Sequence, residues 1–247
     1  GRNTMIKDVL QDLIKYVHSV GVFPALHITQ TADGMTIKSA AADKTSVVTA
    51  ETSLKIGDSE LVYGLGQLEL LDYLIKCPEY KENEKIALVN DDDGKLSKVV
   101  FTNAAGDFTN SYRFMSQTLV ETLVKANLKA KGIQWLAEVT PPVASIQRFN
   151  MQASANSGEQ SFMIKSDADK LVITFGTPAT SGGSFTFATD VVGKINVQQY
   201  PVQTFQKILN LSANAKTVKL KIADGIMCFE LDSGLVKYEF FIMTLSK

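Results

Sequence analysis

One supersecondary unit occurs four times along this chain of 247 residues. In each copy, an amphipathic helix is followed by a strand, a tight Asp-containing turn and a returning strand. The helices are expected to begin near Thr4, Gly66, Pro142 and Pro201. The turns are expected at 32–34, 91–94, 167–170 and 223–225. Each turn follows the start of its helix by roughly 25 residues, and a pair of units recurs after about 135 residues, so we predict one symmetric scaffold built twice.

The apolar residues between these turns indicate the fold class. Residues 5–20 repeat apolar side chains at helical spacing, and runs rich in Val, Ile, Thr and Phe flank the turns as strands do. Helices set against many antiparallel strands predict an α+β fold with two similar domains, each with two helices packed on antiparallel sheets. We predict an N-terminal domain at 1–116, an interdomain connection at 117–131 and a C-terminal domain at 132–247.

Charge and cysteine content exclude several classes of protein. The formal net charge is −1, which argues against a protein that holds nucleic acid through a generally basic surface, although one basic face is compatible with it. Cys77 and Cys228 lie far apart in the sequence, which predicts buried thiols in a reducing compartment rather than a disulfide or zinc site. No apolar run reaches the length of a membrane span, and no signal-peptide pattern is present, so we expect a cytoplasmic protein.

The sequence contains no recognisable catalytic or cofactor motif. It lacks a Gly-rich phosphate loop, HExxH, CxxC and G-x-S-x-G. His27 lies within a predicted strand, where a structural role is favoured over a catalytic one. The acidic run 91–93 precedes Gly94, which favours turn chemistry over metal binding. We therefore expect no enzyme activity, no cofactor and no metal.

Two sets of segments carry a resemblance to a known family. One set lies late in the chain, at 194–197, 200–202, 217–220 and 234–240, and the other lies early, at 33–37 and 43–48. The late set resembles the end, and the early set the first domain, of DNA sliding clamps, the family of the proliferating cell nuclear antigen (PCNA) and the tailed-phage processivity factors. The similar order of elements extends over nearly the whole chain, although identical residues are sparse.

The resemblance implies a homotrimeric ring with six similar domains, whose twelve helices line a channel for duplex DNA. Such a ring is a DNA polymerase processivity factor: it holds DNA topologically and tethers a DNA polymerase and other replication proteins. An ATP-dependent clamp loader is the further implied partner. Because the chain diverges from cellular clamps along most of its length, we expect a phage or other viral source, and the host cytoplasm as its location.

Three sets of residues follow from the resemblance. The DNA-facing candidates, turned away from or flanking the apolar helix faces, are Lys7, Lys15, Lys76, Arg148, Lys207 and, after the last helix, Lys216. The subunit-interface candidates on the edges 107–115 and 183–191 are Tyr112, Phe114, Phe185 and Phe187. The partner-peptide candidates beside the interdomain connection are Ala40, Lys44, Ala213, Phe241, Ile242 and Met243.

Other interpretations of these residues stay open. The lysines and arginine could be solubilising surface charges, and Asp8, Asp12, Glu69 and Asp72 on the same helices weaken the basic signal. The aromatic residues could be ordinary core residues. At the level of the whole protein, the alternatives are a non-ring processivity factor of the same fold and a non-DNA structural or ligand-binding α+β protein.

Overall fold

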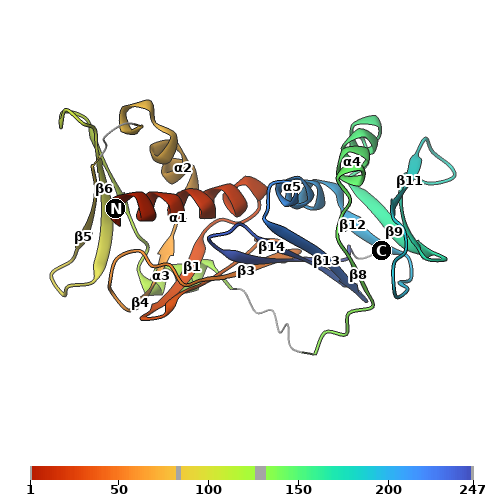
Figure 1. The fold of residues 1–247 in the computed structure, drawn as a ribbon, viewed down its shortest axis with the longest axis horizontal. Helices are drawn as coiled ribbons and strands as arrows, with labels where there is room; N and C mark the ends of the chain where they lie inside the picture. The colour runs from red at the N-terminus through yellow and green to blue at the C-terminus, as the bar shows by residue number, and fades with distance from the viewer. Residues whose placement is uncertain (1, 82–84, 126–131, 246–247) are drawn as a thin grey trace. The chain divides into compact units, whose positions relative to one another are not determined.

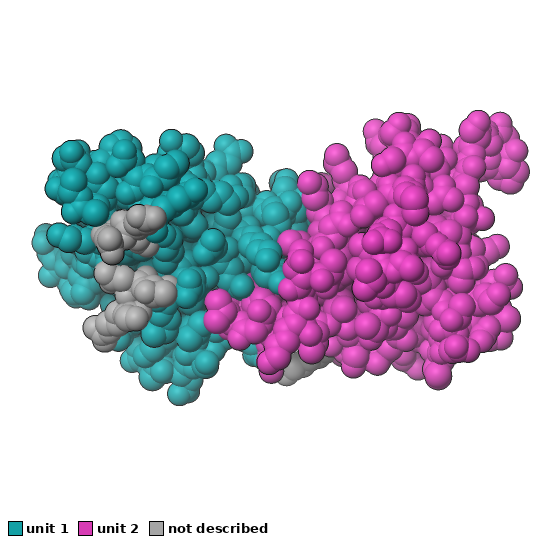
Figure 2. All heavy atoms as spheres, turned by 45° about the horizontal axis from the view of Figure 1, so that its top comes forward, with its two compact units in different colours: residues 1–42, 48–126 teal, residues 43–47, 127–247 magenta. Residues whose placement is uncertain are grey.

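The computed structural model describes residues 2–81, 85–125 and 132–245 (Figure 1). The chain divides into two compact units, one made of residues 1–42 and 48–126 and the other of residues 43–47 and 127–247 (Figure 2).

The first unit contains two sheets and a pair of helices that pack on each other. Its helices are α1 (Arg2–Tyr16), α2 (Leu68–Lys76) and α3 (Gln117–Leu123), with 3-10 turns η1 (His18–Val20) and η2 (Pro78–Tyr80). Its strands are β1 (Leu26–Thr31), β2 (Gly34–Ala40), β3 (Ser46–Thr52), β4 (Leu61–Leu65), β5 (Lys85–Asn90), β6 (Leu96–Thr102) and β7 (Thr109–Arg113). The strand orders are β4-β1-β2-β3 and β5-β6-β7.

The second unit repeats this topology with one additional strand. Its helices are α4 (Val143–Ala155) and α5 (Val202–Ser212). Its strands are β8 (Ala137–Val139), β9 (Ser161–Asp167), β10 (Lys170–Phe175), β11 (Gly183–Ala188), β12 (Gln198–Pro201), β13 (Thr217–Ala223), β14 (Ile226–Asp232) and β15 (Lys237–Met243). The strand orders are β12-β9-β10-β11 and β8-β13-β14-β15. This repetition confirms the α+β class and the repeat predicted from the sequence.

All four predicted turns connect paired antiparallel strands. The closing pairs are Thr31↔Gly34, Asn90↔Leu96, Asp167↔Lys170 and Ala223↔Ile226. In the first turn, a Cβ on Gly34 would lie 2.0 Å from the Thr52 carbonyl oxygen, so only glycine fits there.

The predicted apolar helix faces form the cores. On α1, Val9, Leu10 and Leu13 are fully buried. In the second unit, Phe149 of α4 and Phe205 of α5 lie with their ring centroids 4.8 Å apart. Phe149 also packs on Phe162 of β9, and Phe205 on Phe229 of β14, with ring centroids 5.1 and 5.4 Å apart. Burial of these large aromatic rings holds α4 and α5 against the strands of the second unit.

The two cysteine thiols are free and buried, as predicted. Burial raises the pKa of the Cys228 thiol well above its ordinary value. The thiol of Cys228 is therefore uncharged at neutral pH and chemically inert.

Strands β4, β8 and β12 and helix α3 were not assigned as such from the sequence. Strand β12 is polar and contains Pro201, and β4 contains Gly64, both of which weaken a strand signal. Helix α3 lies in the segment 117–131 that was predicted as the interdomain connection, and it packs against β1 and β4. Residues 126–131 of that segment lie outside the described residues, and the predicted domain boundaries stay a proposal.

Gly64 of β4 allows α3 to pack closely against that strand. The backbone of Gly64 exchanges two hydrogen bonds with that of Met115, at N···O distances of 3.0 and 2.8 Å. A Cβ at position 64 would lie 2.5 Å from Cγ2 of Val120, so the missing side chain allows α3 to approach the strand. In the part of the chain that the structure describes, no helix is long and apolar enough to cross a membrane.

Candidate nucleic-acid interface

The helix pair of the second unit presents a polar face with two cations. Arg148 of α4 and Lys207 of α5 are exposed, as predicted. Next to them, Asn150 Nδ2 donates to Asn210 Oδ1 at 2.8 Å, and Gln206 Nε2 donates to Asn150 Oδ1 at 2.9 Å. These hydrogen bonds between side-chain amides connect α4 to α5 and fix the positions of the polar side chains between the two helices.

The charge of this face is of one sign. Neither α4 nor α5 contains an Asp or Glu residue. Lys216, which follows α5, is also exposed. Cations surrounded by neutral amide donors can contact phosphate oxygens without reading bases, because phosphates attract both kinds of donor regardless of sequence.

The helix pair of the first unit differs in its electrostatics. Lys15 is exposed, with its Nζ 5.7 Å from the centroid of the Tyr16 ring. Lys76 is 69% exposed and forms an ion pair of 2.7 Å with Asp72, one turn earlier on α2. Lys7 is half-buried, and its Nζ donates to the Tyr80 carbonyl oxygen at 3.0 Å.

Acidic residues balance the basic ones on these first-unit helices. Together α1 and α2 contain four basic residues and four acidic ones. The four acids are Asp8, Asp12, Glu69 and Asp72. Helices α1 and α2 therefore attract phosphate less strongly than α4 and α5 do, because their carboxylates carry the same negative charge as the phosphate and repel it.

Two predicted interface strands lie at the ends of their sheets. Strand β7 is an edge strand of the sheet β5-β6-β7, and β11 is an edge strand of the sheet β12-β9-β10-β11. Within the described residues, each has one paired side, so the other side offers backbone groups to a further strand.

The aromatic residues on these two strands mostly belong to the cores of their own units. Tyr112 and Phe187 are fully buried, and Phe114 is 6% exposed. Tyr112 Oη donates to the Gly66 carbonyl oxygen at 2.6 Å, while Phe185 is half-buried. A subunit contact at these strands would therefore use their backbone and exposed side chains, with Phe185 as the accessible ring.

Comparison with known proteins gives no match by sequence: neither a protein-family model nor a curated protein matches. Solved structures do match. PCNA from A. fulgidus, in a structure with the C-terminal region of FEN-1, superposes with a TM-score of 0.69 at 12% identity, over 98% of this chain and 96% of that chain. PCNA from Thermococcus kodakaraensis gives 0.68 at 14% identity, over 97% of both chains.

The chain has the PCNA fold. This confirms the clamp fold that the resemblance implied, although identities of 12% and 14% establish the fold alone. The PCNA fold accounts for the duplicated order of elements, because the superposition extends over both units.

The partner-peptide candidates occupy different environments within this PCNA fold. Phe241 and Ile242 are buried on β15, while Met243, at the end of that strand, is half-buried. The Met243 backbone N–H donates to the Thr45 carbonyl oxygen at 2.9 Å, which places the exposed Lys44 beside the end of β15.

The two alanines of this set lie at element ends. Ala40 is buried at the end of β2, and Ala213 is exposed where α5 ends. Of the six candidates, Lys44, Ala213 and Met243 are therefore accessible within their units.

The sequence did not reveal two exposed apolar residues on α3. Leu119 and Leu123 are 60% and 50% exposed, while Val120 on the same helix is buried against Ala25. Their four-residue spacing was visible as a helical signal, but the direction in which they point depends on the docking of α3, which no local pattern specifies.

The acidic run forms a turn, as predicted. Asp91 Oδ1 accepts hydrogen bonds from the backbone N–H groups of Asp93 and Lys95, both at 2.9 Å, and Gly94 has a φ of +76°. No group of three or more potential metal ligands lies together among the residues that the structure describes.

His27 is 7% exposed on β1, with its Nε2 3.8 Å from Glu121 Oε1. Burial lowers the pKa of His27, with a further lowering from Lys38, and Glu121 opposes the shift. This environment fits the structural role predicted for His27, because it disfavours the charged imidazolium.

Proposed function

We propose that this protein is a DNA sliding clamp, a non-enzymatic processivity factor that encircles duplex DNA as a homotrimer. One observation carries the proposal: the match to PCNA structures extends over nearly all of both chains, so both halves of the clamp fold are present. A ring around DNA cannot dissociate sideways, and a polymerase attached to it stays on the template.

The DNA contacts of the proposed ring are electrostatic and independent of sequence. Arg148, Lys207 and Lys216 would contact phosphates from the second unit, and Lys7, Lys15 and Lys76 would contribute less because of their acidic neighbours and partners. A chain of net charge −1 suits this mechanism, because sliding needs phosphate contacts that are weak enough to exchange.

Ring closure would come from antiparallel pairing of β7 of one subunit with β11 of the next. Within the described residues, both are edge strands, so each has one side whose backbone groups can pair with a strand of another subunit. Head-to-tail contacts of this kind close into a ring when the rotation between subunits allows it.

The proposed partners are a DNA polymerase, an ATP-dependent clamp loader and other replication proteins, in the cytoplasm of a host if the source is a phage. One PCNA structure similar to this chain holds the C-terminal region of FEN-1. We place peptide binding on this chain near Ala40, Lys44, Ala213 and 241–243, and domain boundaries at the 117–131 connection.

Disulfide closure of the proposed β7–β11 contact tests both the ring and its topology. A panel of double variants would combine Ser111→Cys on β7 with Ser184→Cys or Thr186→Cys on β11. Positions 111 and 184 are exposed, and the two native cysteines are buried, so they do not compete. We expect a covalent trimer in at least one pair.

Retention on DNA then distinguishes a ring from a non-ring processivity factor that holds DNA by charge alone. Trimers oxidised in the presence of nicked circular plasmid should survive a wash at high salt and be released when the plasmid is linearised. The single Ser111→Cys variant is the control, since it cannot close the contact. Equal retention on linear and circular DNA would contradict encirclement and favour a non-ring factor.

A further inference from the structure

Tyr73 of α2 differs from every other tyrosine of this chain in its exposure. All seven tyrosines lie within the described residues; six are at most 2% exposed, whereas Tyr73 is 65% exposed. The hydroxyls of Tyr63, Tyr112 and Tyr200 donate to groups in the cores of their own units. Tyrosine is enriched at binding surfaces, because its ring can be covered there while its hydroxyl finds a hydrogen-bond partner.

The internal repeat places Tyr73 where Lys207 lies in the second unit. Helices α2 and α5 begin at Leu68 and Val202, so Tyr73 and Lys207 are each the sixth residue of their helix. Over the nine residues of α2, the burial of each position matches that of α5 except at the third. Lys207 is exposed although β8 precedes the helix pair of its unit, so a preceding strand leaves this position free.

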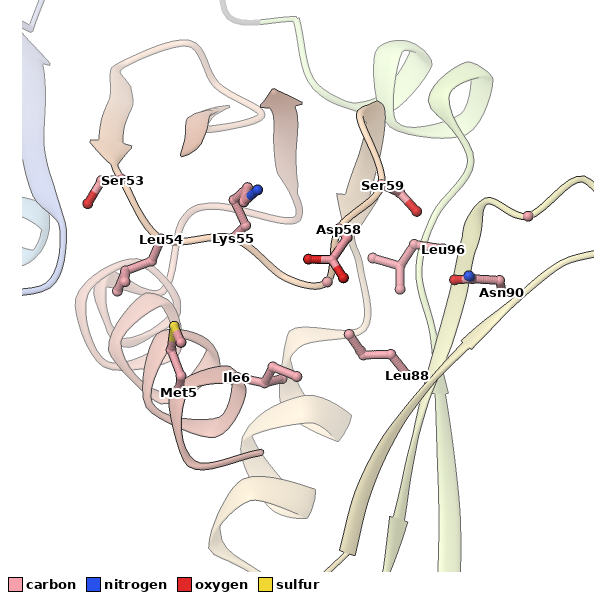
Figure 3. Close-up of a pocket in the computed structure, with 12 residues that line it drawn as sticks. Met5, Ile6, Ser53, Leu54, Lys55, Asp58, Ser59, Leu88, Asn90 and Leu96 are labelled. Carbon is pink, nitrogen blue, oxygen red and sulfur yellow. The ribbon is translucent and has the colours of Figure 1, made fainter. Parts of the chain in front are cut away.

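The opposite side of the helix pair is taken up by packing within the first unit. Leu71 and Leu74 of α2 are buried. Ile6 of α1 is also buried, and it lines a cavity together with Leu88 of β5 (Figure 3). The apolar side of these helices is therefore turned toward the chain's own strands, and Tyr73 points away from that core.

The charges next to Tyr73 favour an uncharged donor at this position. Lys76 forms an ion pair of 2.7 Å with Asp72, so a phosphate that contacts Lys76 competes with that carboxylate. The hydroxyl of Tyr73 carries no charge and has no ion pair to give up. Tyrosine is also one of the side chains that donate to phosphate oxygens without reading the base sequence.

We infer that the hydroxyl of Tyr73 donates a hydrogen bond to a phosphate oxygen of the duplex, an inference that rests on the proposed clamp function. The first unit then holds DNA through a neutral contact that releases no counterion, whereas α4 and α5 use cations. The contribution of Tyr73 therefore persists at salt concentrations that weaken the contacts of Arg148 and Lys207.

Nitration by tetranitromethane tests the contact directly, because Tyr73 has the exposed ring and the six buried tyrosines report on folding. Mass spectrometry of the digested protein follows nitration of Tyr73, with and without duplex at a concentration that saturates the protein. We expect bound duplex to slow this nitration several-fold. The same rate in the free and the bound protein would overturn the inference.

Two substitutions distinguish a neutral contact from a charged one. Tyr73→Phe should weaken the binding of a labelled duplex about threefold and leave the slope of log affinity against log salt concentration unchanged. Tyr73→Lys should make that slope steeper by up to about 0.9 for each phosphate contacted, as Lys207 does at the equivalent position. The matched control is Thr118→Val, which removes an exposed hydroxyl from α3 and should change neither quantity. Unchanged affinity of Tyr73→Phe would refute the contact.

The Tyr73 contact and the clamp function can fail separately in these experiments. If Arg148→Gln with Lys207→Gln weakens duplex binding and Tyr73→Phe does not, DNA binding stands and the Tyr73 contact is refuted. If the wild-type protein shows no saturable binding to duplex at low salt, both are refuted. Circular dichroism and thermal melting of each variant ensure that lost binding does not report unfolding.

Discussion

Neutralising the cations of the second-unit helices should reduce DNA binding more than neutralising those of the first unit. The test variant is Arg148→Gln with Lys207→Gln, which removes both cations from α4 and α5. The matched control is Lys15→Gln with Lys76→Gln, which removes two lysines from α1 and α2. Both pairs are exposed, so neither change disturbs a core.

The magnitude follows from counterion release. Each phosphate contact contributes a slope of about −0.9 to the dependence of log affinity on log salt concentration. Loss of two contacts in one subunit should make that slope shallower by about 1.8, and by about 5.4 if all three subunits of a ring touch DNA together. The control should change the slope by less, because Lys76 already has Asp72 as an ion-pair partner at 2.7 Å.

The assay is fluorescence anisotropy of a labelled duplex over a series of salt concentrations, with two unrelated sequences of equal length. Both sequences should give the same slopes, because phosphate contacts carry no sequence information. An equal or larger change in the control variant would refute the argument that the uniform charge of α4 and α5 concentrates DNA contact in the second unit. Melting temperatures of all variants confirm that they are folded.

Three further predictions concern stability and dynamics. Gly64→Ala should accelerate amide exchange in 117–124 and destabilise the protein by about 1–3 kcal/mol in denaturant unfolding, since the new Cβ displaces α3; unchanged exchange would contradict this. Phe149→Ala should lower the free energy of unfolding by about 3–5 kcal/mol. Met151→Ala, at a position 63% exposed on the same helix, should change it by less than about 0.5 kcal/mol. Similar losses in the two variants would argue against the aromatic core. His27 has a lowered pKa in the folded state, so the unfolded state binds its proton more readily. The contribution of neutral His27 is present above its unfolded pKa of about 6.5 and is lost as pH falls through the lower folded pKa; His27→Gln should flatten this part of the pH–stability curve.

The sequence predicted what local patterns determine. The apolar stripe of α1 and the Asp-containing turns specify helix faces and hairpins within short windows, so these elements could be identified before the structure was considered. Strand β12, with Gln198 and Pro201, forms because β9 lies beside it, and a tertiary contact of this kind leaves no periodic signal.

The candidate site was less predictable, since side-chain exposure depends on packing between distant segments. Tyr112 and Phe185 are both aromatic residues on edge strands, yet Tyr112 is buried, with its hydroxyl donating to the Gly66 carbonyl oxygen, and Phe185 is half-buried.

The solution mass by light scattering, over a concentration series, tests the central claim most directly. A homotrimeric ring predicts a mass of three times the 27.0 kDa of the chain. That mass should persist as the protein is diluted into the low micromolar range. A mass of one chain at every concentration would contradict the stable ring, and the non-ring factor or a protein without a DNA function would then explain the fold better.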